Sequence, residues 1–364
     1  MYRSSSDTNP APRTAAPDSG TAAAPANGTT APNSSTTAPR TDRKAAARDD
    51  GGVLFRKVRV SARDQRVFVG KLVLALALAG GAGYLALRPN WLVALLGACL
   101  LGAVYTHMVE LQHQCLHHSS FRSSRPHRLV GVPLGAPLLV AYSHYRVRHL
   151  QHHRHLGTPQ DSEFFGFDTR KPLTWGQLLR GAFDYARLLG VARDIGLSLA
   201  NRWTYDLGQI AERRRREVNA EYRLFGLLIV AAVAAVPLGA GELVLRLWVL
   251  PLLFAVPMHF LVELPEHILC DTETTDVLRN TRSIKGSWFT TWYTNGNNLH
   301  VEHHAAMTVP INQLPQRHDE VRRRAVHVES SYPAFFRQVI KAVRPGSRPP
   351  SPEQETAVST GALR

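Results

Sequence analysis

The sequence predicts an all-α integral membrane protein with four transmembrane helices in two hairpins and a cytoplasmic helical cap. Four long apolar runs, arranged in two pairs, predict the hairpins. Three clusters of histidines at helical spacing lie outside these runs, and they define the predicted cap. Strongly basic segments precede each pair, which predicts the cytoplasmic side for the clusters.

Composition separates the two ends of the chain from its middle. Residues 1–50 and 345–364 are polar and rich in Pro, and the first of these tails is also rich in Ala, Thr and Ser, so both are predicted to be disordered. A single membrane domain is predicted over residues 51–344. The net charge of +15 comes with no helix-turn-helix, zinc-finger or RNA-binding signature, so no nucleic-acid partner is expected. Anionic lipid headgroups are the expected counterpart of the charge.

The first apolar pair consists of residues 72–87 and 91–105, separated by a short polar turn. One crossing needs about 20 residues, so the first run is extended at its start by residues 67–70. The alternative is a buried helical hairpin in a soluble protein. The apolar stretch at 129–142 is shorter and contains two prolines, which favours a re-entrant or interfacial piece. The first two histidine clusters then lie on one side of the membrane.

The second apolar pair follows a soluble-looking region, residues 164–222. Its runs are residues 224–238 and 243–262, and Arg246 is placed to extend toward the far interface.

The distribution of basic residues predicts the orientation. Residues 56–71 and 213–223 are strongly basic, whereas the turns at 88–90 and 239–242 are not. We therefore expect the histidine clusters and both termini on the cytoplasmic side of the plasma (inner) membrane. The three cysteines, Cys99, Cys115 and Cys270, are too few and too widely spaced for a disulfide framework, which fits a reducing location.

The histidine clusters place several imidazoles on one face of a helix, through spacings of three and four residues. They are His113, His117 and His118; His149, His152 and His153; and His300, His303 and His304. One structural zinc takes four ligands, so nine imidazoles are better shared by two metals. Iron, copper, zinc and nickel all accept imidazole, and ligand type alone does not name the metal.

Further candidates lie at the end of the fourth apolar run. Glu263 and His267 form an i, i+4 pair there, and both are expected to be metal ligands. Glu110 and Glu302 are expected to orient ligating imidazoles. The remaining candidates, expected to be non-ligands, are His107, His144, His155, His259, His318 and His327.

The three clusters resemble, in order, spacing and position, the histidine boxes of the membrane fatty acid desaturase superfamily, which includes hydroxylases and carotenoid ketolases. The resemblance covers about residues 72–324. It implies a cytoplasmic centre of two Fe ions that uses O2, with electrons from a separate donor, expected to be a ferredoxin with its reductase. It matches as box ligands His113, His117, His149, His152, His153, His300, His303 and His304. His118 matches an extra histidine of many members, His267 a ligand upstream of the third box, and Glu263 the place of an Asn near one iron.

The sequence departs from the family pattern at two places near the boxes. Gln114 replaces a common Asp, and residues 305–307 replace a common Leu-Phe-Pro, so the substrate channel is expected to differ. The predicted activity is O2-dependent introduction of a double bond into a fatty acyl chain, with no catalytic residue beyond the metal centre.

Two alternatives remain. A hydroxylase or ketolase acting on a lipid, carotenoid or natural product would carry the same boxes. A membrane metal-binding or transport protein would need charged residues in its spans, and residues 72–87, 91–105 and 224–238 contain none.

Overall fold

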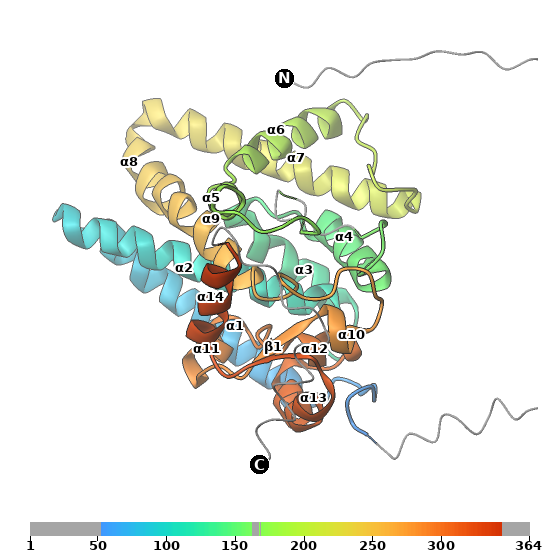
Figure 1. Cartoon of the computed structure of the whole chain (residues 1–364). Helices are drawn as coiled ribbons and strands as arrows, with labels where there is room; N and C mark the ends of the chain where they lie inside the picture. The colour runs from blue at the N-terminus through green and yellow to red at the C-terminus, as the bar shows by residue number, and fades with distance from the viewer. Residues whose placement is uncertain (1–51, 162–166, 168, 344–364) are drawn as a thin grey trace, which may run out of the picture. The chain divides into compact units, whose positions relative to one another are not determined.

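The computed structural model describes residues 52–161, 167 and 169–343. The predicted tails, residues 1–50 and 345–364, lie outside this part of the chain. The described residues are mostly helical, as the sequence predicts (Figure 1). One difference is a short parallel pair of strands, β1 (Arg282–Ile284) and β2 (His327–Glu329).

The first predicted hairpin consists of α1 (Ala62–Ala86) and α2 (Trp91–Leu116). A capping box starts α1: the Asp64 backbone N–H donates to Ser61 Oγ, and the Ser61 N–H donates to the Asp64 carboxylate. The side chain of Asn90 caps α2. Because α2 continues well beyond the predicted run 91–105, its last turn carries His113, and His117 is its C-cap.

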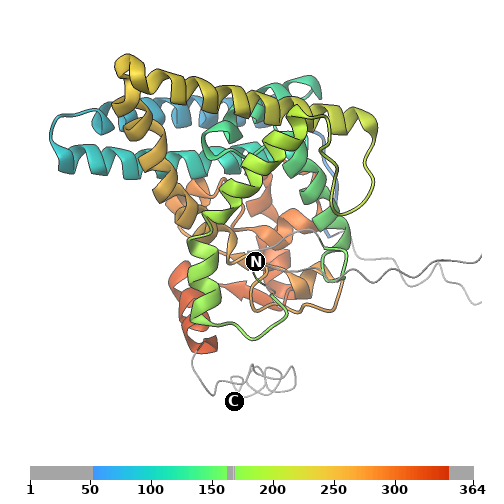
Figure 2. The ribbon, with the colours of Figure 1, turned by 90° about the horizontal axis from the view of Figure 1, so that it is seen from above.

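The second predicted hairpin is one bent helical stretch. It consists of α7 (Glu212–Ala235), the π-helical turn η2 (Val236–Ala240), α8 (Gly241–Val244), the π-helical turn η3 (Leu245–Val249) and α9 (Leu250–Glu263). Gly239 has φ 87°, a conformation that glycine adopts without strain. The stretch therefore bends at Gly239 into two arms (Figure 2).

Three helical stretches are long and apolar enough to cross a membrane: Ala62–Ala86, Trp91–Leu116 and Glu212–Glu263. The third is 52 residues long, more than twice the roughly 20 residues of one crossing. Its two arms coincide with the third and fourth predicted runs. Large apolar side chains on these helices point outward, and Leu238 is 84% exposed. Such a surface fits contact with lipid hydrocarbon.

The turns of the two hairpins contact each other. Arg246 donates from Nη1 to the carbonyls of Ala86 and Arg88, at 3.3 and 2.8 Å, and pairs with Glu242 at 2.6 Å. Both turns accordingly lie on the same side in Figure 1. The sequence placed Arg246 near this end, and the structure shows that it binds the neighbouring turn.

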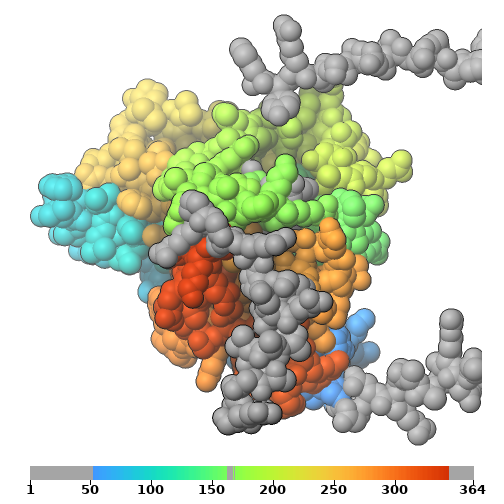
Figure 3. Space-filling model, in the orientation of Figure 1, coloured from blue at the N-terminus to red at the C-terminus, as the bar shows by residue number. Residues whose placement is uncertain are grey.

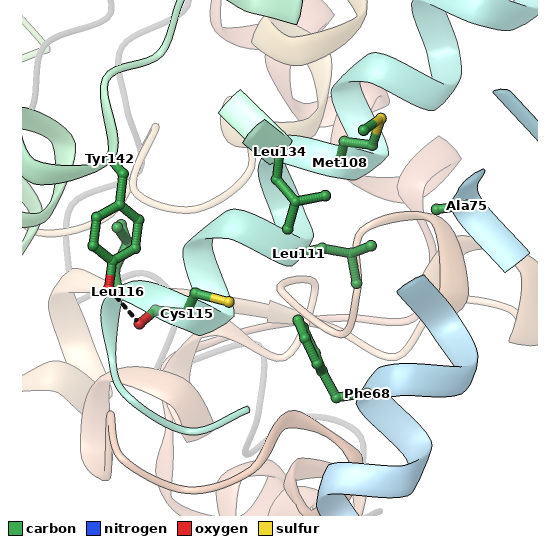
Figure 4. Close-up of a cluster of buried hydrophobic side chains, with 8 residues drawn as sticks. All are labelled: Phe68, Ala75, Met108, Leu111, Cys115, Leu116, Leu134 and Tyr142. Carbon is green, nitrogen blue, oxygen red and sulfur yellow. Dashed lines mark hydrogen bonds between the residues drawn. The ribbon is translucent and has the colours of Figure 1, made fainter. Parts of the chain in front are cut away.

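A buried apolar cluster joins the helices that carry the first two histidine clusters (Figure 4). Phe68 and Leu111 pack there with Leu134 of α3 (Arg125–Gly135) and Tyr142, the first residue of α4 (Tyr142–His155). The Tyr142 hydroxyl donates to the carbonyl of Cys115 at 3.0 Å. The predicted re-entrant piece 129–142 thus forms the end of α3, the 3-10 turn η1 (Ala136–Leu138) and the link to α4.

The remaining helices include α12 (His300–Ala305), which carries the third histidine cluster. The others are α5 (Trp175–Ala182), α6 (Ala186–Leu199), α10 (Val277–Asn280), α11 (Trp288–Tyr293), the 3-10 helix η4 (Ile311–Arg317), α13 (His318–Arg324) and α14 (Tyr332–Ala342). Leu178 of α5, Phe260 of α9 and Phe335 of α14 share one core cluster. The surfaces of α5 and α14 adjoin in Figure 3. All three cysteines are free.

Candidate metal centre

Nine of the predicted ligands converge in two groups. The five-histidine group is His113, His117, His149, His153 and His303. The four-histidine group is His152, His267, His300 and His304. Within each group the candidate ligand atoms all lie within 4.8 Å of one another. Two such groups fit two metal ions, each held by imidazoles.

Each HxxHH cluster is divided between the two groups. In α4, His149 and His153 belong to the five-histidine group, whereas His152 belongs to the other. In α12 the division is reversed, because His303 alone joins the five-histidine group. Each of these helices therefore supplies ligands to both groups. The three histidines of one cluster do not all belong to the same group.

The inward nitrogens of the five-histidine group are all Nε2 atoms. His149 Nε2 lies 2.7 Å from His113 Nε2, 2.9 Å from His117 Nε2 and 2.9 Å from His153 Nε2. His303 Nε2 lies 3.1 Å from His153 Nε2. Metal–imidazole bonds of about 2.1 Å place neighbouring ligand nitrogens roughly this far apart. The geometry therefore fits one cation.

The four-histidine group has the same arrangement. His267 Nε2 lies 3.1 Å from His152 Nε2 and 3.2 Å from His300 Nε2. His304 Nε2 lies 3.1 Å from His300 Nε2. Its ligands come from α4, α12 and the turn after α9, so the group forms only when these three parts of the chain meet.

Outer partners orient three imidazoles of the four-histidine group. His152 Nδ1 is 2.8 Å from Asp161 Oδ1, His267 Nδ1 is 3.0 Å from the carbonyl of Asn280, and His300 Nδ1 is 2.9 Å from Asn297 Oδ1. An acceptor at Nδ1 stabilises the tautomer that donates there and leaves the Nε2 lone pair for a metal.

Burial keeps these imidazoles neutral. Desolvation, followed by the charge of neighbouring histidines, lowers the pKa of His149, His153, His303 and His304 well below its ordinary value. Neutral imidazole is the form that binds metals. These four histidines thus have both the geometry and the protonation state of ligands.

Glu266 is a further residue of the site that sequence reasoning missed. Its Oε2 lies 3.2 Å from His300 Nε2, about as close as the imidazole nitrogens lie to one another. Its other oxygen accepts a hydrogen bond from the Asn297 side chain. Glu266 is buried. Its position next to the expected ligand His267 is the feature of the sequence that could have identified it. The structure thus places a carboxylate beside the four-histidine group.

Two predicted ligands lie elsewhere. Glu263, the last residue of α9, has a carboxylate oxygen 3.2 Å from His259 Nδ1. His118 follows the end of α2 with φ 55°, and its ring stacks on His127 at 4.6 Å. Among the described residues, neither joins the two groups, and nor does any histidine expected to be a non-ligand.

Glu302 connects secondary-structure elements. Its carboxylate accepts hydrogen bonds from Ser283 Oγ and, at 2.7 Å, from His318 Nδ1. It thereby ties α12 to β1 and α13. Orientation of imidazoles, expected of Glu302, is a role that Asp161 and Asn297 have in the structure.

Arg282 holds the turn that carries Glu266 and His267. Its side chain is fully buried, and Nη1 donates to the carbonyls of Pro265 and Ile268 at 2.9 and 2.5 Å. Its backbone N–H donates to the Glu266 carbonyl at 2.9 Å.

Replacing Arg282 with methionine is expected to destabilise the protein by about 3 kcal/mol, because two buried carbonyls lose charged donors. Thermal unfolding of the detergent-purified protein measures this. The control is Arg279→Gln, because the Arg279 side chain is 46% exposed. Equal midpoints for both variants would contradict the role of Arg282.

Comparison with known proteins matches the part of the chain that forms both groups. The family model for fatty acid desaturase matches residues 89–336, which include both groups. The chloroplastic omega-3 fatty acid desaturase of Brassica napus is 35% identical over 95 residues, 26% of this chain and 23% of that protein. The corresponding protein of Glycine max is 32% identical over 101 residues, 28% of this chain and 22% of that protein. The chain thus matches less than a quarter of the length of these relatives. Because the family model matches more than half of the chain, the chain belongs to the fatty acid desaturase family.

Proposed function

We propose that this chain uses O2 to introduce a double bond into a fatty acyl chain, with one iron ion in each histidine group. The convergence of five and four imidazoles on two points carries the proposal. Two irons fit this donor set, because imidazole is among the ligands of iron and nine imidazoles are too many for one zinc.

The protein's own contribution is positioning. When bound, the two irons supply the O2-dependent oxidising power that removes hydrogen from an unactivated C–H bond. Asp161, Asn280 and Asn297 hold three imidazole rings in a fixed orientation. The histidines are largely buried, which excludes water from the site. Fixing the acyl chain beside this site lowers the entropic part of the barrier.

The proposed topology is four crossings with both termini and the histidine groups in the cytoplasm, in the plasma (inner) membrane. The bend at Gly239 supports two crossings in the stretch Glu212–Glu263. The contact of Arg246 with the α1–α2 turn supports placing both hairpin turns at one membrane face. The basic segments preceding each hairpin support the orientation.

A separate electron donor, a ferredoxin with its reductase, completes the proposal. Net charge supports it, because a chain of +15 attracts an acidic carrier by electrostatic steering. O2 and a membrane lipid are the other reactants.

The test combines metal analysis with lipid mass spectrometry. Purified protein is expected to contain about two irons per chain. Lipids from cells expressing it are expected to show a species lighter by two hydrogens, absent with His303→Ala. A gain of one oxygen instead would reassign the reaction to hydroxylation. One zinc per chain, or no iron, would refute the proposal.

A further inference from the structure

A cavity lies beside the five-histidine group, between η1, α4, α6 and α7. It measures about 200 Å³ and is lined largely by apolar side chains, with Leu138, Leu188 and Val191 among them. In Figure 1, α4 and α6 both lie beside α7, and side chains from all three form one core cluster. Ligand pockets of about 300–1,000 Å³ hold drug-sized molecules, so this cavity has room for part of a lipid.

Tyr145 connects the cavity to the metal centre. Its side chain lines the cavity, and its ring centroid lies 5.5 Å from that of His149 and 6.3 Å from that of His113. A molecule in the cavity is therefore one side chain away from two members of the five-histidine group.

Arg187, on α6, brings a positive charge to the apolar wall. Its Nε and Nη2 atoms are buried and have no hydrogen-bond partner within the described part of the chain. Glu263 and Asp184 lie close enough to influence its charge, yet neither accepts a hydrogen bond from these two nitrogens. A buried donor without a partner is unfavourable, so a ligand that accepts hydrogen bonds from the guanidinium is bound more tightly.

Other polar side chains, among them His144 and Arg148, line the same cavity. His144 bonds through Nδ1 to the Tyr222 hydroxyl at 2.6 Å, and its Nε2 is buried without a hydrogen-bond partner in the described residues. Arg148 lies 3.8 Å from Asp206, which is a weak ion pair. The polar part of the lining is therefore predominantly cationic or neutral.

We propose that this cavity binds the anionic oxygen group of a single-chain lipid, a carboxylate or a phosphate, through Arg187. The planar guanidinium presents paired donors that match the geometry of either anion. The first methylenes of the chain pack against Leu188 and Val191. On the outer side of α6, Leu189 is 73% exposed, so an apolar surface lies next to the cavity wall formed by Leu188 and Val191. The statement that this lipid is the substrate rests on the proposed function. The binding of the lipid in the cavity does not depend on that function.

The test is equilibrium binding of lipids to the purified full chain. Oleate supplies a carboxylate, lysophosphatidate a phosphate, and oleamide a neutral headgroup on the same hydrocarbon. The wild type is expected to bind at least one of the two anions roughly tenfold or more tighter than oleamide. The anion that shows the larger preference identifies the headgroup.

Variants test the assignment to Arg187. Arg187→Gln is expected to abolish the preference for the anion and to leave oleamide binding unchanged. The matched control is Arg193→Gln on the same helix, because that side chain is 70% exposed and pairs with Asp194. Leu188→Trp fills the cavity and is expected to weaken binding of all three lipids.

Several results would overturn the proposal. The first is wild-type protein that binds oleamide as tightly as it binds both anions. The second is an Arg187→Gln variant that keeps the preference for an anion over oleamide, and the third is a Leu188→Trp variant that binds all three lipids as the wild type does. The first comparison needs no variant, so it stands even if a variant fails to fold. A chain that prefers anions but holds no iron refutes the proposed reaction alone, whereas a chain that oxidises lipids without this preference refutes the cavity alone.

Discussion

Replacing His117 with alanine is expected to remove the metal of the five-histidine group and to abolish lipid oxidation, whereas His118→Ala leaves both metals bound. His117 Nε2 lies 2.9 Å from His149 Nε2 and 3.3 Å from His113 Nε2, among the ligands. Loss of an outer partner costs about 10–100-fold in metal affinity, and loss of a ligand is expected to cost at least about 100-fold. Iron per chain after dialysis against a chelator then falls from about two to about one.

The adjacent variant is the matched control. His118 has the same sequence surroundings, but its ring stacks on His127 outside both groups. Iron content and lipid products are measured in parallel for both variants. If His118→Ala lost iron as His117→Ala did, the ligand set expected from the sequence would be right and the grouping seen in the structure would be wrong.

Glu266→Ala is expected to release the metal of the four-histidine group, while Glu263→Ala retains it. The Glu266 carboxylate lies 3.2 Å from His300 Nε2, and it also binds Asn297, which orients the His300 ring. The substitution therefore removes a charged oxygen beside the metal and loosens one imidazole. Glu263 contacts His259 instead, away from both groups.

Metal content and Mössbauer spectroscopy of the two variants measure this difference. In Glu266→Ala, the signal of one iron is expected to disappear or shift while the other stays. Glu266→Gln keeps the size and the oxygen but loses the charge, so an intermediate change is expected. Equal spectra for Glu263→Ala and Glu266→Ala would exclude a specific role of Glu266.

Much of the fold was predictable because its signals are local. The apolar runs 72–87 and 91–105 predict α1 and α2, since the composition of a membrane helix is set by the hydrocarbon around it. The bend at Gly239 falls in the predicted turn between the other two runs. The short strands β1 and β2 were not predictable, because three residues leave no periodic pattern and their pairing joins distant parts of the chain.

The identity of eight of the nine imidazoles in the two groups follows from spacings of three and four residues, whereas His267 lies in the turn after α9. What spacing does not contain is the rotation of each helix about its axis relative to its neighbours. That rotation assigns His149 and His153 to one group and His152 to the other.

The positions of helix ends account for the remaining differences between the ligands expected from the sequence and the side chains found at the two groups. Because α2 ends at Leu116, His118 turns toward His127, and because α9 ends at Glu263, the following turn carries Glu266 to His300. Buried Arg282 holds that turn from a distant strand. The sequence by itself therefore determined the helices and the histidines they carry. Only the tertiary structure decided which side chains share a metal and which carboxylate lies beside it, because packing between helices orients side chains that local spacing leaves unassigned.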